Sequence, residues 1–508
     1  MELLRNEFER IEAQEKAENL LVDFRGNLSL VELSSDVSER SRQIEKICQE
    51  FDDLALKLFP VELGHFTVKD QKTISSRYKN ASFEQKRTLR SMLAVLVLAP
   101  DRPENIIVSE SSPFYQIFTH SQEISPVINK TKLSIESFNQ MREEMFMACP
   151  DKQDLLTLET VLSLHDTTKL KTVAAKVESL SGVTSINHDL LLSFMTQNPR
   201  LINELVPSLN RLSREQKELA IQVMNLQYNR GQHAQAEASA AHLIFVGQDY
   251  ADQRLVRMQR QESNADLAGL DGTLGGKYFE EMFQHYKIAD LSIDLMRTGD
   301  LNIKQAYLFT LQNRAAMMGV EIDLDEWDFE TRAGLEKITL LRFACQYQMS
   351  TYDEFMLLNH CFAGLAPLNR DALVETFGRS GLDDKVGILF YYSPALMCSI
   401  RDLEIEEDKI DGARFGIERG LKLMSRIAKE TLRFFEKPEI QAFPLYTLLR
   451  TGKLVMLEDV LEIRGVNRDK SGRVIEYVVA LTEILKDYSK KLSVSEAGLG
   501  EADFTLVD

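Results

Sequence analysis

The sequence DLLTLETVLSLH at residues 154–165 is the stretch from which the fold class is predicted. Its apolar residues recur at helical spacing, which is typical of a helix that packs into a protein core. These apolar residues are Leu155, Leu156, Leu158, Val161, Leu162 and Leu164. The stretch therefore predicts a well-packed helix that ends at His165 and Asp166, and a rigid site is easiest to build at such a place.

The same spacing recurs through most of the chain. A helix with a continuous apolar face is predicted to begin near Ser82, and another is predicted over residues 134–148. Ser213 and Gln216 form a predicted capping box at the start of a further long helix. Strand-like alternation does not persist, and the sequence has no repeat of fixed period. We therefore predict an all-α protein made of two or three helical subdomains.

Turn-forming residues suggest where these subdomains end. They cluster between Pro100 and Pro126, and a glycine-rich connector is predicted at residues 264–276. The predicted segments are an N-terminal helical arm at 1–100, a central helical domain with the candidate site at 127–262, a C-terminal helical domain at 277–491, and an acidic tail at 492–508 that is expected to be disordered.

Composition excludes several classes of protein. Hydrophobic residues make up 44% and charged residues 27% of the 508 residues, as in a folded soluble protein. The net charge of -18 argues against a protein that mainly binds nucleic acid or an anionic membrane. The start of the chain lacks the features of a secretory signal, and the longest apolar run, at residues 92–99, is too short to span a bilayer. We expect a cytosolic protein without a membrane span.

His233 and Glu237 form the first candidate site. Four residues apart on one helix, they would project from the same face with Cβ atoms about 6 Å apart. A carboxylate so placed would fix the imidazole tautomer and favour its protonated form, as suits a general base. Small residues after Gly231 would leave room for a ligand. The alternative interpretation is an ordinary solvated helix face.

A serine followed later by His-x-x-x-Glu resembles the Ser-HxxxE family of bacterial toxins and host-directed effectors. On this resemblance His233 and Glu237 match the HxxxE pair, while Ser193 or Ser185 supplies the serine. Characterised members transfer AMP from ATP, and a Legionella member needs host actin as an activator. The resemblance implies ATP as the substrate, Mg²⁺ as a candidate cofactor, a host protein as the acceptor and actin as a candidate activator.

Nucleotidyl transfer also needs positive groups around an α-phosphate. Lys169 and Arg230 are the candidates for this nucleotide-binding role, beside His233. The acidic, signal-free composition suits a protein exported without a cleaved signal peptide into a host cytosol.

A second resemblance concerns the His-Asp pairs. Residues 165–169 read HDTTK and resemble the HD-x-x-K signature of the His-Asp metal phosphohydrolases, with Thr168 where glycine is usual. In that superfamily His and Asp side chains bind divalent transition-metal ions that activate water and neutralise phosphate charge. The family also needs an earlier histidine, for which His120 is the candidate, and a distal aspartate that cannot be singled out. The implied metal ligands are His165, Asp166, His188 and Asp189.

A third interpretation needs no catalysis. Histidines are often buried in helical cores, so the chain could be an all-α interaction protein whose histidines are structural.

Overall fold

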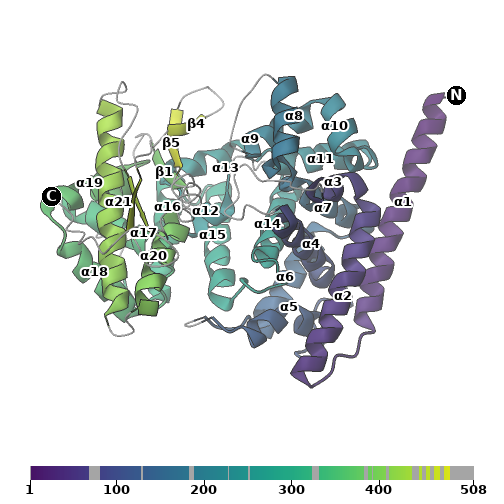
Figure 1. The fold of residues 1–508 in the computed structure, drawn as a ribbon, viewed down its shortest axis with the longest axis horizontal. Coiled ribbons are helices and arrows are strands. Elements are labelled where there is room, and N and C mark those ends of the chain that lie inside the picture. Colours follow the sequence, from purple (N-terminus) through teal and green to yellow (C-terminus); the bar gives the residue numbers. More distant parts are fainter. Residues whose placement is uncertain are drawn as a thin grey trace, which may run out of the picture. The chain divides into compact units, whose positions relative to one another are not determined.

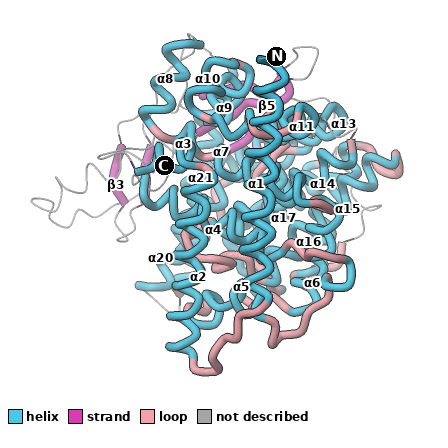
Figure 2. The backbone as a smooth tube through the Cα atoms, turned by 90° about the vertical axis from the view of Figure 1, so that its right-hand side faces the viewer, coloured by secondary structure: helices cyan, strands magenta, loops and turns pink. Residues whose placement is uncertain are grey.

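The computed structural model describes residues 2–67, 81–127, 130–181, 188–226, 228–249, 252–322, 331–382, 387–391, 393–407, 411–436, 445–448, 454–457, 463–468 and 474–480. The chain divides into two compact units. The first comprises Met1–Gln227 and Asp249–Gln284, and the second comprises Tyr228–Gln248 and His285–Asp508. Helices dominate the described residues, which confirms the predicted all-α class (Figure 2).

The first unit is entirely helical where it is described (Figure 1). Its helices are α1 (Glu2–Ser29), α2 (Val37–Leu58), α3 (Pro60–Gly64), α4 (Ala81–Leu98), α5 (Pro113–Ile124), α6 (Ile135–Ala148), α7 (Lys152–His165), α8 (Lys171–Ser181), α9 (His188–Gln197), α10 (Pro199–Leu205), α11 (Arg214–Met224) and α14 (Gln253–Gly269). Short 3-10 turns lie at His65–Thr67 (η1), Pro103–Asn105 (η2), Thr167–Lys169 (η3) and Pro207–Asn210 (η4).

Helices α1 and α2 form a helical hairpin. The rings of Phe24 on α1 and Phe51 on α2 lie 5.5 Å apart, and Phe51 is fully buried. The α2 residues that are buried with it, Ile44 and Ile47, recur at helical spacing, which explains why this face turns inward. The two long helices stand at the N-terminal edge of this unit (Figure 1).

Helix α4 is the core of the first unit. From Thr88 to Leu98 every side chain is buried, which fits the continuous apolar face that the sequence predicts. Helix α14 packs closely along it, because a Cβ atom at Gly269 would lie 2.5 Å from the Ser91 nitrogen and 2.6 Å from the Arg87 carbonyl oxygen. Glycine is therefore required where these two backbones meet.

Two predicted connecting stretches contain helix instead. The turn-rich stretch between residues 100 and 126 holds α5, because Pro113 occupies its first turn and Tyr115 and Phe118 bury its apolar face. The predicted connector at 264–276 begins inside α14, which continues to Gly269. Asp266 therefore lies on a helix rather than in a loop.

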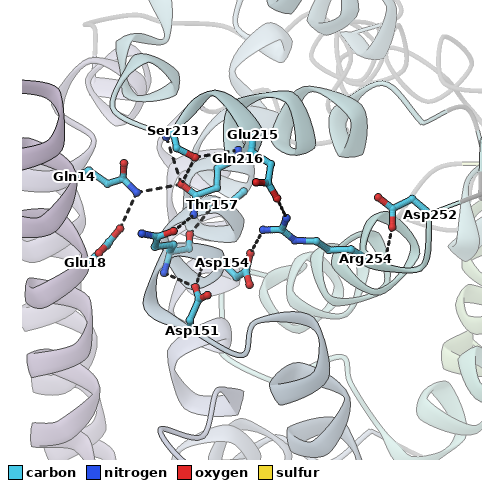
Figure 3. Close-up of polar contacts among 11 residues, drawn as sticks. Gln14, Glu18, Asp151, Asp154, Thr157, Ser213, Glu215, Gln216, Asp252 and Arg254 are labelled. Atoms are coloured by element: carbon cyan, nitrogen blue, oxygen red, sulfur yellow. Dashed lines mark hydrogen bonds and ion pairs between the residues drawn. The ribbon is translucent and has the colours of Figure 1, made fainter. Parts of the chain in front are cut away.

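A polar network joins four helices of the first unit (Figure 3). The amide of Gln14 on α1 donates to the side chain of Gln216 on α11 at 3.1 Å. The capping box of Ser213 and Gln216 at the start of α11 is present, as predicted. Arg254 on α14 donates to Asp154 on α7 at 2.6 Å and also pairs with Glu215 on α11. These bonds hold α14 against α7 and α11.

The second unit is also mainly helical. Its helices are α12 (Arg230–Ala234), α13 (Ile244–Asp249), α15 (Glu280–Thr298), whose first residues belong to the first unit, α16 (Ile303–Met317), α17 (Arg332–Gln346), α18 (Tyr352–Ala363), α19 (Pro367–Leu373), α20 (Ser393–Glu407) and α21 (Gly412–Glu436). A 3-10 turn at Ala240–Leu243 (η5) and a π-helical turn at Val374–Arg379 (η7) complete them.

Short strands in the second unit are the one departure from helix among the described residues. Strand β1 (Gly387–Tyr391) runs parallel to β5 (Val474–Ala480), and β4 (Ile463–Arg468) runs antiparallel to β5. Strands β2 (Leu445–Leu448) and β3 (Leu454–Leu457) form an antiparallel pair. Gly387 stands opposite Glu476, and Ile463 stands opposite Val479.

The units divide the predicted central segment 127–262. Residues up to 227 and from 249 belong to the first unit, whereas 228–248 belong to the second. The predicted tail at 492–508 lies outside the described residues. Within the described part of the chain, no helix combines the length and the apolar character needed to cross a bilayer.

Candidate functional site

Helix α7 delivers His165 and Asp166 to the candidate site. The helix begins where the Asp151 carboxylate accepts the backbone N–H groups of Gln153 and Asp154, and it ends at His165 as predicted. The Nδ1 of His165 donates to the Leu162 carbonyl oxygen at 2.8 Å. This bond fixes the ring and turns Nε2 toward the side chains that gather beyond the helix end.

Asp266 on α14 meets His165 there. Its Oδ1 lies 3.1 Å from the His165 Nε2, and an Oδ1 of Asp166 lies 3.4 Å from the same nitrogen. One potential ligand atom from each of the three residues lies within 4.8 Å of the other two. The three side chains, hereafter the His-Asp-Asp cluster, thus converge on one point, although Asp266 is 101 residues distant from His165 in the chain.

Two cations line the same cluster. Arg87 on α4 has nitrogens 3.9 Å from Asp166 and 3.7 Å from Asp266, and it pairs with Glu84 at 2.9 Å. Lys169 in turn η3 pairs with Asp166 and lies 3.8 Å from Glu84. These cations balance the buried carboxylates and could also contact the oxygens of a bound phosphate.

Two pKa values at the cluster are raised, that of His165 by neighbouring carboxylates and that of Glu262 by burial. Burial disfavours a charged imidazole, but the carboxylates of Asp166 and Asp266 outweigh it and raise the pKa of His165 to about 10. Burial raises the pKa of Glu262 to about 7 against the opposing pull of His165. Glu262 lies one helical turn before Asp266 on α14, so a carboxyl group that titrates near neutral pH stands beside the cluster.

The cluster is reached from solvent on the side of Asp266. The Asp266 side chain is 32% exposed and that of His165 is 14% exposed, whereas Asp166 is buried. A small molecule or ion could approach the partly exposed side chains of His165 and Asp266. Asp166 would bind it from the buried side of the cluster.

These residues fit a divalent transition metal. One imidazole nitrogen and two carboxylates are the ligand types that such ions take, and the His165 ring already has the second bond, to Leu162, that orients a metal-bound histidine. An ion would replace the proton on His165, and the Lys169 ammonium would move away from Asp166. Both changes are available, since the lysine stem is flexible and the proton is exchangeable.

The other predicted metal ligands lie apart from the cluster or outside the described residues. The Nε2 of His120 on α5 lies 2.8 Å from the Ser41 hydroxyl of α2, and burial lowers the pKa of His120. The earlier helix that reaches the cluster is α4, which contributes Glu84 and Arg87. The side chains of His188 and Asp189 lie outside the described residues.

His233 and Glu237 do not share a helix. Helix α12 ends at Ala234, and Ala236 has a φ of 50°, in the left-handed region. The backbone N–H groups of Glu237 and Ala238 both bond to the Gln232 carbonyl oxygen, which closes the helix end. The expected same-face geometry is therefore wrong, because the chain reverses between the two residues.

The His233 imidazole is neutral at physiological pH. Burial and the neighbouring His242 lower the pKa of His233 to about 3, and Asp290 only partly opposes them. Its Nε2 lies 3.1 Å from both the Ser292 and the Thr310 hydroxyl oxygens. The Glu237 carboxylate was expected to favour the protonated ring. Burial has the largest effect on the pKa of His233 instead, and it favours the neutral ring.

The remaining predicted residues take different roles. Arg230 is buried and forms a bidentate ion pair with Asp290, at 2.8 and 2.5 Å. Ser193 on α9 accepts a hydrogen bond from Gln197 and belongs to the first unit, whereas His233 belongs to the second. Lys169 pairs with Asp166 of the His-Asp-Asp cluster, in the first unit. Ser185 lies outside the described residues.

Sequence reasoning missed the residues that α4 and α14 bring to the cluster. Glu84 and Arg87 stand at the start of a strongly apolar helix, and charged residues in a buried position usually mark an ion pair or a site. Glu262 and Asp266 share one face of α14 at a spacing of four. These two signals could have drawn attention to the residues, but not to their meeting with His165.

Comparisons with known proteins place the chain in a family. No curated protein and no solved structure shows a significant similarity to the chain. A family model described as "Family of unknown function (DUF6829)" matches residues 45–441, which is most of the chain. The chain therefore belongs to the family of unknown function DUF6829.

Proposed function

We propose that this protein is a metal-dependent phosphohydrolase with its centre at the His-Asp-Asp cluster. The observation that carries the proposal is the position of Asp266, whose carboxylate lies 3.1 Å from His165. It supplies the distal aspartate that the resemblance to His-Asp phosphohydrolases requires. His165, Asp166 and Lys169 match the histidine, aspartate and lysine of that family's HD-x-x-K signature.

The residues around the cluster have distinct tasks in such a reaction. A divalent ion held by His165, Asp166 and Asp266 would activate water and offset phosphate charge. Arg87 and Lys169 neutralise the remaining charge on the phosphate oxygens. In hydrolysis the water oxygen bonds to phosphorus, the ester bond breaks, and the leaving oxygen gains a proton. Glu262, with its pKa of about 7, accepts the proton that the water loses.

Phosphatase assays test this proposal. The purified chain would be incubated with para-nitrophenyl phosphate, its bis ester and a set of nucleotides, each with Mn²⁺, Zn²⁺ or Mg²⁺. We expect release of phosphate or nitrophenol, and a loss of about a hundredfold or more in His165→Ala and Asp266→Asn. His120→Ala is the matched control, since it removes a histidine of the same unit that lies apart from the cluster, and it should keep full activity.

Two outcomes would count against the proposal. The first is no hydrolysis with any of these metals and substrates. The second is full activity in both cluster variants, provided that each unfolds cooperatively like the wild type.

AMP transfer from ATP to a host protein acceptor is the second proposal. One observation favours it: the Nδ1 of the buried His233 has no hydrogen-bond partner in the described part of the chain, so this ring keeps an acceptor available. Incubation with α-labelled ATP and host lysate, with and without actin, should label a protein, and His233→Ala should abolish the label. Location in the cytosol and export into a host cell belong to this proposal. Absence of label under every condition would eliminate it.

A further inference from the structure

Arg314 on α16 is a buried cation, and only one of its three guanidinium nitrogens donates a hydrogen bond to the described residues. Its side chain is 1% exposed, and its Nη1 donates to the Ala234 carbonyl oxygen at 3.1 Å. Among the described residues, the Nε and Nη2 atoms have no hydrogen-bond partner. Within the described part of the chain, no carboxylate forms an ion pair with Arg314. A buried charge without a counter-ion is costly, so a compensating group is expected here.

Two other buried arginines of the same unit have the acceptors that Arg314 lacks. Arg230 uses its Nε and Nη2 atoms to hold both carboxylate oxygens of Asp290. Arg342 donates to the carbonyl oxygens of Ala236, Phe377 and Glu237 through its three nitrogens. Arg314 therefore has free the same edge, Nε with Nη2, that binds a two-oxygen acceptor in Arg230.

Cys345 does not supply the missing negative charge. Its thiol is buried near Arg314 and Arg342, and burial raises the pKa of Cys345. The sulfur therefore stays protonated at neutral pH despite the two guanidinium groups. Burial likewise lowers the pKa of Arg314, as expected of a cation that lacks a close anion.

A second open polar atom belongs to His233, the residue before Ala234, whose carbonyl oxygen accepts a hydrogen bond from the Arg314 Nη1. Thr310, four residues before Arg314 on α16, contacts the His233 Nε2. Ser292 and Thr310 donate their hydroxyl protons to the carbonyl oxygens of Ala289 and Ala306. From this network Nε2 carries the proton and donates to both hydroxyl oxygens, so the unpartnered Nδ1 is an acceptor.

We infer that the second unit binds a small oxyanion at Arg314. Two oxygens of a carboxylate or phosphate group would accept from Nε and Nη2, and an O–H or N–H group of the same ligand would donate to the His233 Nδ1. The site is independent of the His-Asp-Asp cluster and of the proposed hydrolase activity. Its chemistry favours small hydroxy acids or hydrogen phosphate over large polyanions, because both open groups are buried.

Thermal unfolding of the full chain tests the site. Sodium phosphate, glycolate and acetate would be added at millimolar concentrations, with sodium chloride held at matched ionic strength. We expect phosphate or glycolate to raise the melting temperature above that in chloride alone, and acetate, which lacks a donor, to raise it less. In Arg314→Met the response to all three anions should disappear, because the variant keeps the volume of the side chain but removes the charge and the donors.

Arg332→Met is the matched control, because Arg332 is a half-exposed surface arginine of the same unit that pairs with Glu336. It removes one positive charge and should leave the anion response intact. Equal responses in Arg314→Met and wild type would overturn the inference, as would no response in the wild type. Calorimetric titration of the wild type with phosphate gives a readout that does not depend on how well Arg314→Met folds, and absence of heat there would also overturn it.

Discussion

The Nε2 of His165 lies 3.1 Å from the Oδ1 of Asp266, and the two residues are 101 positions apart in the chain. Helix α7 positions the first and α14 the second, and both helices pack around α4. The surrounding carboxylates hold a proton on His165, since they raise its pKa to about 10. The same carboxylates would attract a metal cation. A proton and a metal ion therefore compete for His165, so both metal affinity and the free energy of unfolding should depend on pH.

Metal affinity should rise with pH. Because the His165 pKa is about 10, the proton on Nε2 must leave before an ion can bind. We expect the affinity for Zn²⁺ or Mn²⁺ to increase by about tenfold per pH unit below that pKa. Competition titrations with a chromogenic chelator at pH 6.5, 7.5 and 8.5 would measure it. Asp266→Asn lacks one of the three ligands and should bind the ion too weakly for this titration. A pH-independent affinity in the wild type would contradict a metal site at His165.

The metal-free protein should respond to pH in the opposite direction. The pKa of His165 is raised in the folded state to about 10 from its ordinary value of 6.5, so the protonated ring contributes stability fully below pH 6.5. This contribution falls as pH rises toward 10. Chemical denaturation in the presence of a chelator should therefore show a smaller free energy of unfolding at pH 9 than at pH 7. In His165→Gln the decrease should be smaller than in the wild type, because the buried Glu159 still destabilises the fold as pH rises but the contribution of the ring is gone. An equal decrease in the two proteins would show that His165 does not contribute to it.

Gly269 should be intolerant of a larger side chain. A methyl group there would meet the backbone of α4 at 2.5 and 2.6 Å, so the two helices must separate. Gly269→Ala should lower the free energy of unfolding by about 1 to 3 kcal/mol and weaken metal binding through Asp266. Gly26 in α1 is the matched control, since nothing lies within 4 Å of its added Cβ. Gly26→Ala should stabilise by about 0.5 to 1 kcal/mol, and similar effects at both glycines would refute the close contact.

Glu159 in α7 should be replaceable by an apolar residue. It is fully buried, and neither carboxyl oxygen has a hydrogen-bond partner among the residues that the structure describes. Burial raises the pKa of Glu159 well above its usual range. Because the folded state holds the proton more tightly than the unfolded state, this group destabilises the fold increasingly as pH rises above 4.5. Glu159→Met should therefore stabilise, by about 1 kcal/mol or more, and more at pH 8 than at pH 5. Glu143→Met, at an exposed position, serves as the control. If Glu159→Met were less stable than the wild type at pH 8, the Glu159 carboxyl group would have to form a stabilising interaction in the folded protein.

The sequence predicted helix α7 and its end at His165 because those features depend on local spacing. It also predicted the capping box of Ser213 and Gln216, which is a contact between near neighbours. It could not single out Asp266, because the meeting of α14 with α7 is a tertiary contact. The packing of α14 on α4 at Gly269 positions that carboxylate, and helical periodicity does not report it.

The expected pairing of His233 with Glu237 failed for a different reason. The chain turns at Ala236 with a positive φ, a conformation that alanine rarely adopts and that no local residue signals. Hydrogen bonds from Arg342 and Gln346 to the Ala236 carbonyl oxygen hold the turn. Both donors come from α17, more than a hundred residues later.

The metal content of the purified chain shows directly whether the His-Asp-Asp cluster binds an ion. Wild type, His165→Ala, Asp266→Ala and the control His120→Ala would be loaded with Mn²⁺ or Zn²⁺, freed of excess ion and analysed by inductively coupled plasma mass spectrometry. We expect about one ion per chain in wild type and in His120→Ala, and almost none in the two cluster variants. Wild-type protein that retains no ion after loading, or cluster variants that retain as much as the wild type, would contradict a metal centre at His165, Asp166 and Asp266.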